Sequence, residues 1–190
     1  MNHAVDLNSF FGYAPANNRA GIEWFVVNPA AGKVALQGYL GAAGHDFTYP
    51  AIGVTASGRG VVAFTATGDT LFPSAAYAPI DAITGPGAWA VVPGGEGAAP
   101  DDGFTSYKAQ VGGNPPRTRR GDYGAAAVDG NSIWVASEYV AHACDYEKRG
   151  GRFGARTGDN KLGTCAASPG APGTRAALGN WSTRISKLTP

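Results

Sequence analysis

The segment from residue 122 to residue 139, DYGAAAVDGNSIWVASEY, constrains the fold more than any other part of the chain. Two apolar runs, at residues 125–128 and 132–136, flank the tripeptide Asp129-Gly130-Asn131. Asp-Gly between two such runs is a strong hairpin signal, because both central residues of a type I′ turn have positive φ. The side chains of the second run alternate between two faces, as they do along a strand. The segment therefore predicts a β-hairpin with a type I′ turn.

The composition favours short strands over long helices. Glycine accounts for 29 of 190 residues, and charged residues make up 15 %, against roughly 25 % in a typical soluble domain. Long surface helices need Glu, Lys and Leu, which are scarce here. Hydrophobic residues at 44 % are sufficient to build a core and argue against disorder over most of the chain.

Strand-like runs recur along the chain, and no window has the 3.6-residue period of an amphipathic helix. The sequence therefore predicts an all-β protein. The expected strands are residues 22–27, 33–40, 49–56, 61–67, 74–80, 88–92, 104–111, 125–128, 132–136 and 181–188.

One pattern, an apolar run, a glycine-containing turn and a second apolar run, appears three times, at about residues 22–40, 49–67 and 123–139. We expect its turns, at residues 28–32, 57–60 and 129–131, to occupy equivalent places. Small antiparallel sheets repeated every 40–50 residues are typical of propeller blades. The prediction is a partial β-propeller of about three antiparallel blades, with a β-sandwich as the alternative.

The domain organisation follows from this repeat. Residues 1–19 are expected to be an N-terminal extension, and residues 20–190 an incomplete propeller domain with an insertion at 141–179. Because propellers typically close with four to eight blades, three blades leave exposed edges and open apolar faces on the end sheets. We therefore expect either the remaining blades of a longer chain or a second copy as a partner.

Both cysteines, Cys144 and Cys165, lie in the predicted insertion, which has little hydrophobic content to order it. A disulfide between them would close a loop of about twenty residues and contribute about 3 kcal/mol in the chain-entropy model. Such a bond implies an extracellular or periplasmic location. The first residues lack the basic start and apolar stretch of a signal peptide, so we expect a preceding segment to be missing.

Charge and motif content exclude several function classes. The net charge of +1 creates no overall field for nucleic acid or a membrane surface, and no run of 18 apolar residues predicts a membrane span. His142 precedes Cys144 without the spacing of a zinc site, and the glycine-rich stretches lack the strand–loop–helix setting of a phosphate cradle. We predict no metal and no cofactor.

Residues 119–140, RRGDYGAAAVDGNSIWVASEYV, followed by residues 180–188, NWSTRISKL, resemble the last blade of bacterial sialidase-like β-propeller proteins of the BNR/Asp-box type. The resemblance covers about residues 20–190, with a break across the insertion. Arg120 stands where this family commonly has Trp, and Gly124 where it has Ser. By this resemblance Asp129 and Trp134 alone match an Asp box, which implies a structural role for them. Gly130, in the predicted turn, is expected to be structural as well.

The resemblance also implies a type of chemistry. A sialidase holds a carboxylate with three arginines, uses a tyrosine nucleophile activated by a glutamate, and has an acid–base aspartate. Tyr123 and Glu138 are geometrically able to meet across the hairpin, whereas the adjacent Glu138 and Tyr139 point to opposite faces. An ordinary cross-strand pair is the alternative. The candidate catalytic residues are Arg120, Asp122, Tyr123, Glu138 and Arg184.

Exposed aromatic rings at a propeller mouth are able to stack on sugar faces, and Trp89, Tyr139 and Trp181 are the candidates for ligand binding. Burial in the core is the alternative for each of these rings. An adhesive role for the tripeptide Arg120-Gly121-Asp122 is disfavoured, because it leads directly into a strand instead of occupying a loop tip.

Two functions remain open. The preferred one is a non-catalytic extracytoplasmic propeller module that serves as a recognition or scaffold surface, with carbohydrate or a protein as its partner. The alternative is the C-terminal part of a sialidase-like glycoside hydrolase. At least two arginines with a Tyr–Glu contact around the axis favour the enzyme, whereas Ala, Gly and Val favour the module.

Overall fold

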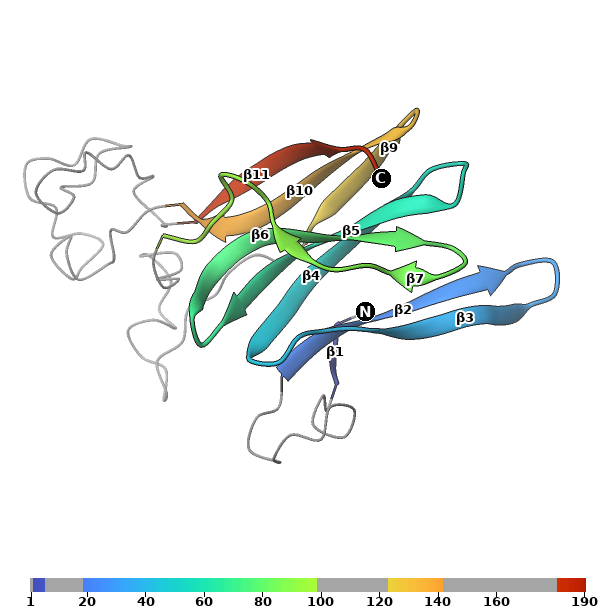
Figure 1. The fold of residues 1–190 in the computed structure, drawn as a ribbon, viewed down its shortest axis with the longest axis horizontal. Coiled ribbons are helices and arrows are strands. Elements are labelled where there is room, and N and C mark those ends of the chain that lie inside the picture. Colours follow the sequence, from blue (N-terminus) through green and yellow to red (C-terminus); the bar gives the residue numbers. More distant parts are fainter. Residues whose placement is uncertain (1, 6–18, 99–122, 142–180) are drawn as a thin grey trace, which may run out of the picture.

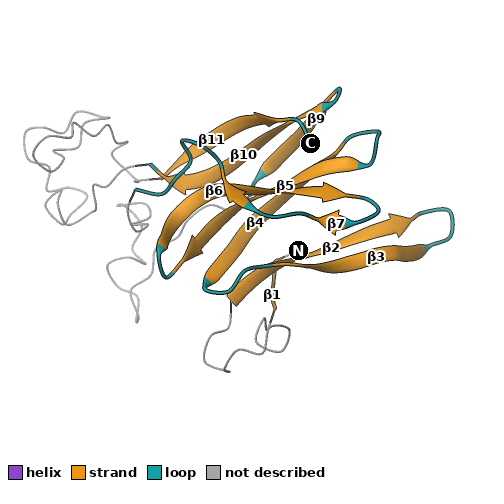
Figure 2. Cartoon of the chain, in the orientation of Figure 1, coloured by secondary structure: helices purple, strands orange, loops and turns teal. Residues whose placement is uncertain are grey.

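A computed structural model describes residues 2–5, 19–98, 123–141 and 181–190. Every regular element in these ranges is a β-strand, which confirms the all-β prediction (Figure 2). The strands are β1 (Asn2–Val5), β2 (Arg19–Asn28), β3 (Lys33–Leu40), β4 (His45–Val54), β5 (Arg59–Gly68), β6 (Leu71–Asp81), β7 (Gly85–Pro86), β8 (Ala90–Val91), β9 (Ala125–Asp129), β10 (Ser132–Val140) and β11 (Trp181–Leu188).

The strands form three antiparallel sheets (Figure 1). Sheet A has the order β1-β2-β3, and sheet B has the order β4-β5-β6-β7 with β8 paired to β6. Sheet C has the order β11-β10-β9. Sheet B lies between the other two, because β4 contacts β2 and β9, while β5 and β6 contact β10. The sheets are therefore stacked in chain order, A then B then C.

Two apolar cores hold the stack together. The core between sheets A and B contains Ile22 and Leu40 from sheet A and Phe47, Val62 and Phe64 from sheet B. The core between sheets B and C joins Val61 and Ala63 of β5 to Ile133 and Val135 of β10.

Residues 60–66 of β5 are buried without interruption, because one face of this strand meets sheet A and the other meets sheet C. Strands covered on both faces read as continuous apolar runs instead of alternating ones, and VVAFTA has this character. The position of β5 between sheets A and C therefore explains why its apolar run does not alternate.

Three antiparallel sheets stacked in chain order are what a partial propeller of about three blades requires. Sheet B also curls around the A–B core, and this curvature equally fits the β-sandwich alternative (Figure 1). The expected strands at 33–40 and 181–188 have the bounds of β3 and β11. The expected strand at 104–111, most of the insertion at 141–179, and the Cys144–Cys165 pair lie outside the described residues.

The hairpin between β9 and β10 is confirmed, but the predicted turn type is wrong. Asp129 pairs with Ser132, so the loop is Gly130-Asn131 alone. Gly130 has φ of 60°, and among the described residues Tyr49 is the only non-glycine with positive φ. Positive φ at the first central position alone is the pattern of a type II′ turn, which prefers glycine there.

The expected equivalence of the three turns is also wrong. The turn at residues 28–32 joins the second and third strands of sheet A, whereas those at 57–60 and 129–131 join the first and second strands of sheets B and C. The first strand of sheet A is β1, which pairs with β2 from Asn2 to Val5 within the expected extension. Turn residues indicate that two runs pair, but they do not show where that pair lies in its sheet.

Candidate functional site

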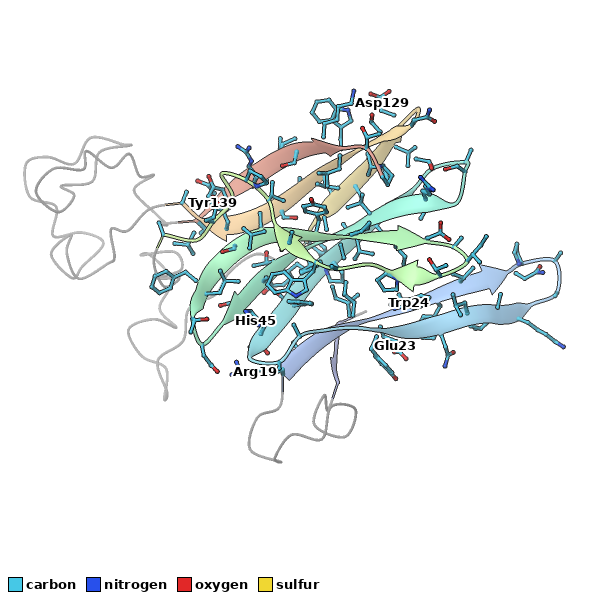
Figure 3. The ribbon with its side chains drawn as sticks, in the orientation of Figure 1. Arg19, Glu23, Trp24, His45, Asp129 and Tyr139 are labelled. Atoms are coloured by element: carbon cyan, nitrogen blue, oxygen red, sulfur yellow. The ribbon has the colours of Figure 1, made fainter. Side chains whose placement is uncertain are left out.

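Arg19 lies at the joint between sheets A and B, at the start of β2 (Figure 3). Its Nη1 donates to Asp46 Oδ2 at 3.1 Å, and its Nη2 donates to Asp69 Oδ1 at 2.7 Å. The other oxygen of Asp46 accepts the backbone N–H of Ala20 at 2.7 Å. The hydrogen bond that Arg19 donates to Asp69, followed by the one that it donates to Asp46, raises the pKa of the Arg19 guanidinium. Because these charges satisfy one another, the group acts as a clamp between the sheets.

His45 and Trp89 continue the packing next to this clamp. The His45 ring contacts Trp89 edge-on at a centroid distance of 5.1 Å, and its Nδ1 lies 2.8 Å from the carbonyl oxygen of Ala43. Trp89 also meets Phe47 edge-on at 5.0 Å and packs against the A–B core. The structure therefore gives Trp89 a packing contact in the core, and its proposed stacking on a sugar ring stays a prediction.

Glu23 and Tyr39 form a cross-strand pair on the face of sheet A that points away from sheet B. The negative charge of Glu23 is the main cause that raises the pKa of the Tyr39 phenol above its ordinary value of 10.0, and a hydrogen bond with Glu23 adds to it. Sequence reasoning missed this pair, because its residues are 16 positions apart and meet only through the register of β2 and β3. The predicted hairpin of residues 22–40 was the available signal, because pairing its two runs brings Glu23 opposite Tyr39.

The structure describes three of the five candidate catalytic residues, Tyr123, Glu138 and Arg184, and it does not bring Glu138 and Arg184 together. Glu138 pairs with Thr183, and Arg184 pairs with Ser137, so Glu138 and Arg184 project from opposite faces of sheet C. The guanidinium of Arg184 donates from Nη2 to the carbonyl oxygen of Pro93 at 2.9 Å. Arg120 and Asp122 lie outside the described residues.

Tyr123 precedes β9 and does not reach the ladder. The pairing of β9 with β10 ends at Ala125 and Ala136, two residues short of a Tyr123–Glu138 pair. The Tyr123 side chain is 84 % exposed. The register of β9 with β10 therefore does not pair Tyr123 with Glu138.

Tyr139 and Trp181 lie at the end of sheet C where β10 meets the start of β11. Tyr139 pairs with Ser182 and Trp181 with Val140, so the two rings come from neighbouring rungs and opposite faces. Both side chains are half-buried. Together with Trp89 in the A–B core, they do not form one aromatic surface.

Asp129 lies at the tip of the β9–β10 hairpin (Figure 3), where its carboxylate meets Trp134. Trp134 Nε1 donates to Asp129 Oδ2 at 3.3 Å, and Lys187 Nζ lies 3.7 Å from the same oxygen. The Lys187 ammonium also lies 5.4 Å from the centre of the Trp134 ring, within cation–π range. The three side chains are exposed, and they tie the hairpin to β11.

The first strands of sheets B and C, β4 and β9, lie side by side and contact each other through small residues. A Cβ placed on Gly53 would lie 3.5 Å from the Cβ of Ala126 and 2.7 Å from Ile133 Cγ2. A Cβ on Gly124 would lie 3.4 Å from the Cβ of Ala51. Alanine, glycine and branched aliphatic side chains therefore dominate this contact.

A shallow pocket of about 270 Å³ opens at the end of sheet B where β5 begins and β6 ends. Arg59 and Asp81 form a cross-strand pair beside it. The Asp81 carboxylate is turned toward its own loop, where Oδ1 accepts the N–H groups of Ile83 at 2.8 Å and Thr84 at 3.3 Å. The lining residues are Arg59, Pro79, Ile80, Asp81, Thr84, Gly85, Gly87 and Pro190.

Two further observations concern the described ranges as a whole. They contain no group of three or more His, Cys, Asp and Glu side chains placed to share a metal ion. They also contain no helix with the length and apolarity needed to cross a membrane. Comparison with known proteins gives no match, since no protein-family model, no curated protein and no solved structure is similar to this chain.

Proposed function

We propose that this chain is a non-catalytic extracytoplasmic module that serves as a recognition or scaffold surface. The observation that carries the proposal is the contact between β4 and β9, where Ala51, Gly53 and Ala126 stand in place of charged side chains. In a propeller the first strands of the blades surround the axis, where an enzyme of this type would need its arginines and its nucleophile. The separation of Glu138 from Arg184 across sheet C supports the same proposal.

The test is an assay of the full chain against a fluorogenic aryl sialoside over an acidic to neutral pH range. We expect the rate of product release to equal that of the protein-free buffer. Turnover that disappears in both Glu138→Gln and Arg184→Gln, but persists in the control Arg59→Gln, would contradict the proposal. Binding of sialyllactose without turnover, followed by saturation-transfer NMR, would support recognition of carbohydrate.

A second candidate function, the C-terminal part of a sialidase-like hydrolase, is favoured by one contact, that of Glu23 with Tyr39. Arg19, four residues before Glu23, is engaged by two aspartates and supplies no free guanidinium. The pKa of Tyr39 is also raised, which makes its phenolate less available as a nucleophile at neutral pH. Turnover abolished by Tyr39→Phe and by Glu23→Gln in the same assay would establish this candidate instead.

The extracytoplasmic location in the proposal rests on Cys144 and Cys165. Intact-mass measurement after alkylation without a reductant tests it on protein purified from an oxidising compartment. We expect neither cysteine to be alkylated until the protein is reduced. Alkylation of both cysteines in the unreduced protein would remove the argument for that location.

A further inference from the structure

The outer face of sheet A, which points away from sheet B, carries apolar side chains in contact with solvent. Phe25 is 50 % exposed, Val27 57 % and Val34 49 %. Strand alternation and the register of β2 with β3 put these residues on one face with the Glu23–Tyr39 pair. A face of this kind on a soluble protein marks an interaction surface.

The outer face of sheet C has the same character. Trp134 is 43 % exposed and Ile185 is 64 % exposed. The register places Ala127 beside Trp134, and Ala136 beside Ile185, on the side of sheet C that points away from sheet B. The same side also carries Lys187, whose ammonium lies 5.4 Å from the centre of the Trp134 ring. Both ends of the stack therefore expose apolar side chains, with a lysine beside them on sheet C.

Sheet B shows how sheets of this chain cover one another. One of its faces packs on Ile22 and Leu40 of sheet A, and the other packs on Ile133 and Val135 of sheet C. Placing the outer face of sheet C on the outer face of sheet A from a second copy continues the same series, A–B–C followed by A–B–C. No new type of contact is needed.

The area of the two faces suits an assembly that uses both of them. With about 3.4 Å per residue and about 4.8 Å between strands, each face spans roughly 350 Å². One such contact is somewhat less than half of the roughly 800 Å² per partner found in stable interfaces, whereas two contacts together come close to it. Closure, in which each copy uses both faces, is therefore favoured over a single contact.

The number of sheets points to two copies. Closed propellers typically contain four to eight blades. Two copies supply six sheets, while one copy supplies three and three copies supply nine. A ring of two copies has two-fold symmetry, so its two A-to-C contacts are identical.

We infer that two copies of this chain associate head to tail, with the outer face of sheet A in each copy packed on the outer face of sheet C in the other. This inference rests on the propeller module proposed above. It identifies the partner of both open faces as a second copy of the chain.

The first test is the molar mass of the full chain in solution, measured by sedimentation equilibrium over a range of concentrations. We expect twice the chain mass of 19.3 kDa. Phe25→Asp and Ile185→Asp should each reduce the mass to that of one chain. The matched control is Ile83→Asp, since Ile83 is 85 % exposed in the loop after β6 and belongs to neither face.

The second test distinguishes head-to-tail contact from contact between like faces. A mixture of the Phe25→Asp and Ile185→Asp proteins can form one A-to-C contact between two intact faces, so it should show association that is weaker than that of the wild type but absent from either variant alone. Unchanged circular dichroism and a cooperative denaturation transition confirm that each variant is folded, while the midpoint should fall by the stability that association contributes.

Three outcomes would overturn the inference. They are a monomeric wild-type chain, a Phe25→Asp protein that remains dimeric, and polymers that lengthen with concentration in place of a closed dimer. Failure here is separate from failure of the proposed function. A dimer that hydrolyses the sialoside overturns only the function, and a monomer without hydrolysis overturns only this assembly.

Discussion

Gly38 lies directly opposite Trp24 in the β2–β3 ladder, and a Cβ built on Gly38 would come within 2.8 Å of Trp24 Cζ2. Gly85 of β7 meets the same indole, since its Cβ would lie 3.0 Å from Cη2. The Trp24 ring therefore fits against two glycines, one from sheet A and one from sheet B. Among the described residues its buried Nε1 has no hydrogen-bond partner, so packing against the A–B core, and not a hydrogen bond, holds the ring there.

Gly38→Ala should lower the free energy of unfolding by about 1–3 kcal/mol, because the added methyl group overpacks the indole. Trp24→Phe in the Gly38→Ala background should recover part of this loss, since phenylalanine lacks the ring atoms that crowd Gly38. Urea denaturation of the two single variants and the double variant measures the coupling. Gln37→Ala, at the next and exposed position of β3, is the control and should be close to neutral. Strictly additive effects would show that the two residues do not touch.

Removing the Glu23 carboxylate should change the titration of Tyr39. The phenol has a raised pKa in the folded protein, chiefly because of the charge of Glu23, so Glu23→Gln should lower it toward 10.0. Ultraviolet absorbance of tyrosinate follows the change, and Tyr39→Phe identifies the component that belongs to this residue. Glu96→Gln, an exposed glutamate in the loop after β8, is the matched control.

The same pair gives the sign of a pH effect on stability. The folded protein holds the Tyr39 proton more tightly than the unfolded chain does, so the contribution of this pair is complete below pH 10 and is lost as the pH rises through the folded pKa. Denaturation midpoints measured on either side of this range should fall more steeply with pH in the wild type than in Tyr39→Phe. Equal slopes would rule out the contribution.

Gly130→Ala should destabilise sheet C through the backbone alone. Gly130 has φ of 60°, and no atom lies within 4 Å of a Cβ built there, so the cost is that of a left-handed conformation, about 1–2 kcal/mol. Asn131→Ala, at the second loop position, is the control and should cost less. Thermal or urea unfolding measures both. Equal effects at the two positions would contradict the type II′ turn.

Thr65 links sheets B and C by a hydrogen bond from its hydroxyl to the carbonyl oxygen of Glu138 at 2.8 Å. Thr65 is buried, so Thr65→Val removes this donor at nearly constant shape and should cost about 1 kcal/mol. Thr65→Ser keeps the hydroxyl and loses only a methyl group. Hydrogen exchange in β10 should accelerate in the valine variant alone. Acceleration in the serine variant alone would assign the link to packing.

Features of the fold that depend on residues close in the sequence were predictable, whereas features that depend on distant residues were not. The Asp-Gly sequence and the apolar runs around it predicted the hairpin of β9 and β10, because neighbouring strands and their turn lie within twenty residues. The turn type differed, because Asp129 remains paired with Ser132 and only Gly130 takes positive φ. Strand β1 escaped prediction, because four residues in a polar segment become a strand only beside β2.

The candidate site was less predictable than the fold. Arg184 and Glu138 were chosen by type and by resemblance, but the β10–β11 register places them on opposite faces of sheet C. The clamp of Arg19 with Asp46 and Asp69 spans 27 and 50 residues of sequence, and no local pattern announces it. Contacts between residues so far apart in the sequence depend on how the sheets pack against each other, and local sequence patterns carry no information about that packing.

By itself the sequence determined that this chain folds into antiparallel strands, because backbone preference, alternation and turn chemistry act over a few residues. Tertiary structure alone decided that β5 is central, that Trp24 fits against Gly38 and Gly85, and that Phe25 and Ile185 are exposed on the outer faces of sheets A and C. Those outcomes depend on packing between sheets, where the energy comes from shape and burial shared by residues far apart in the chain.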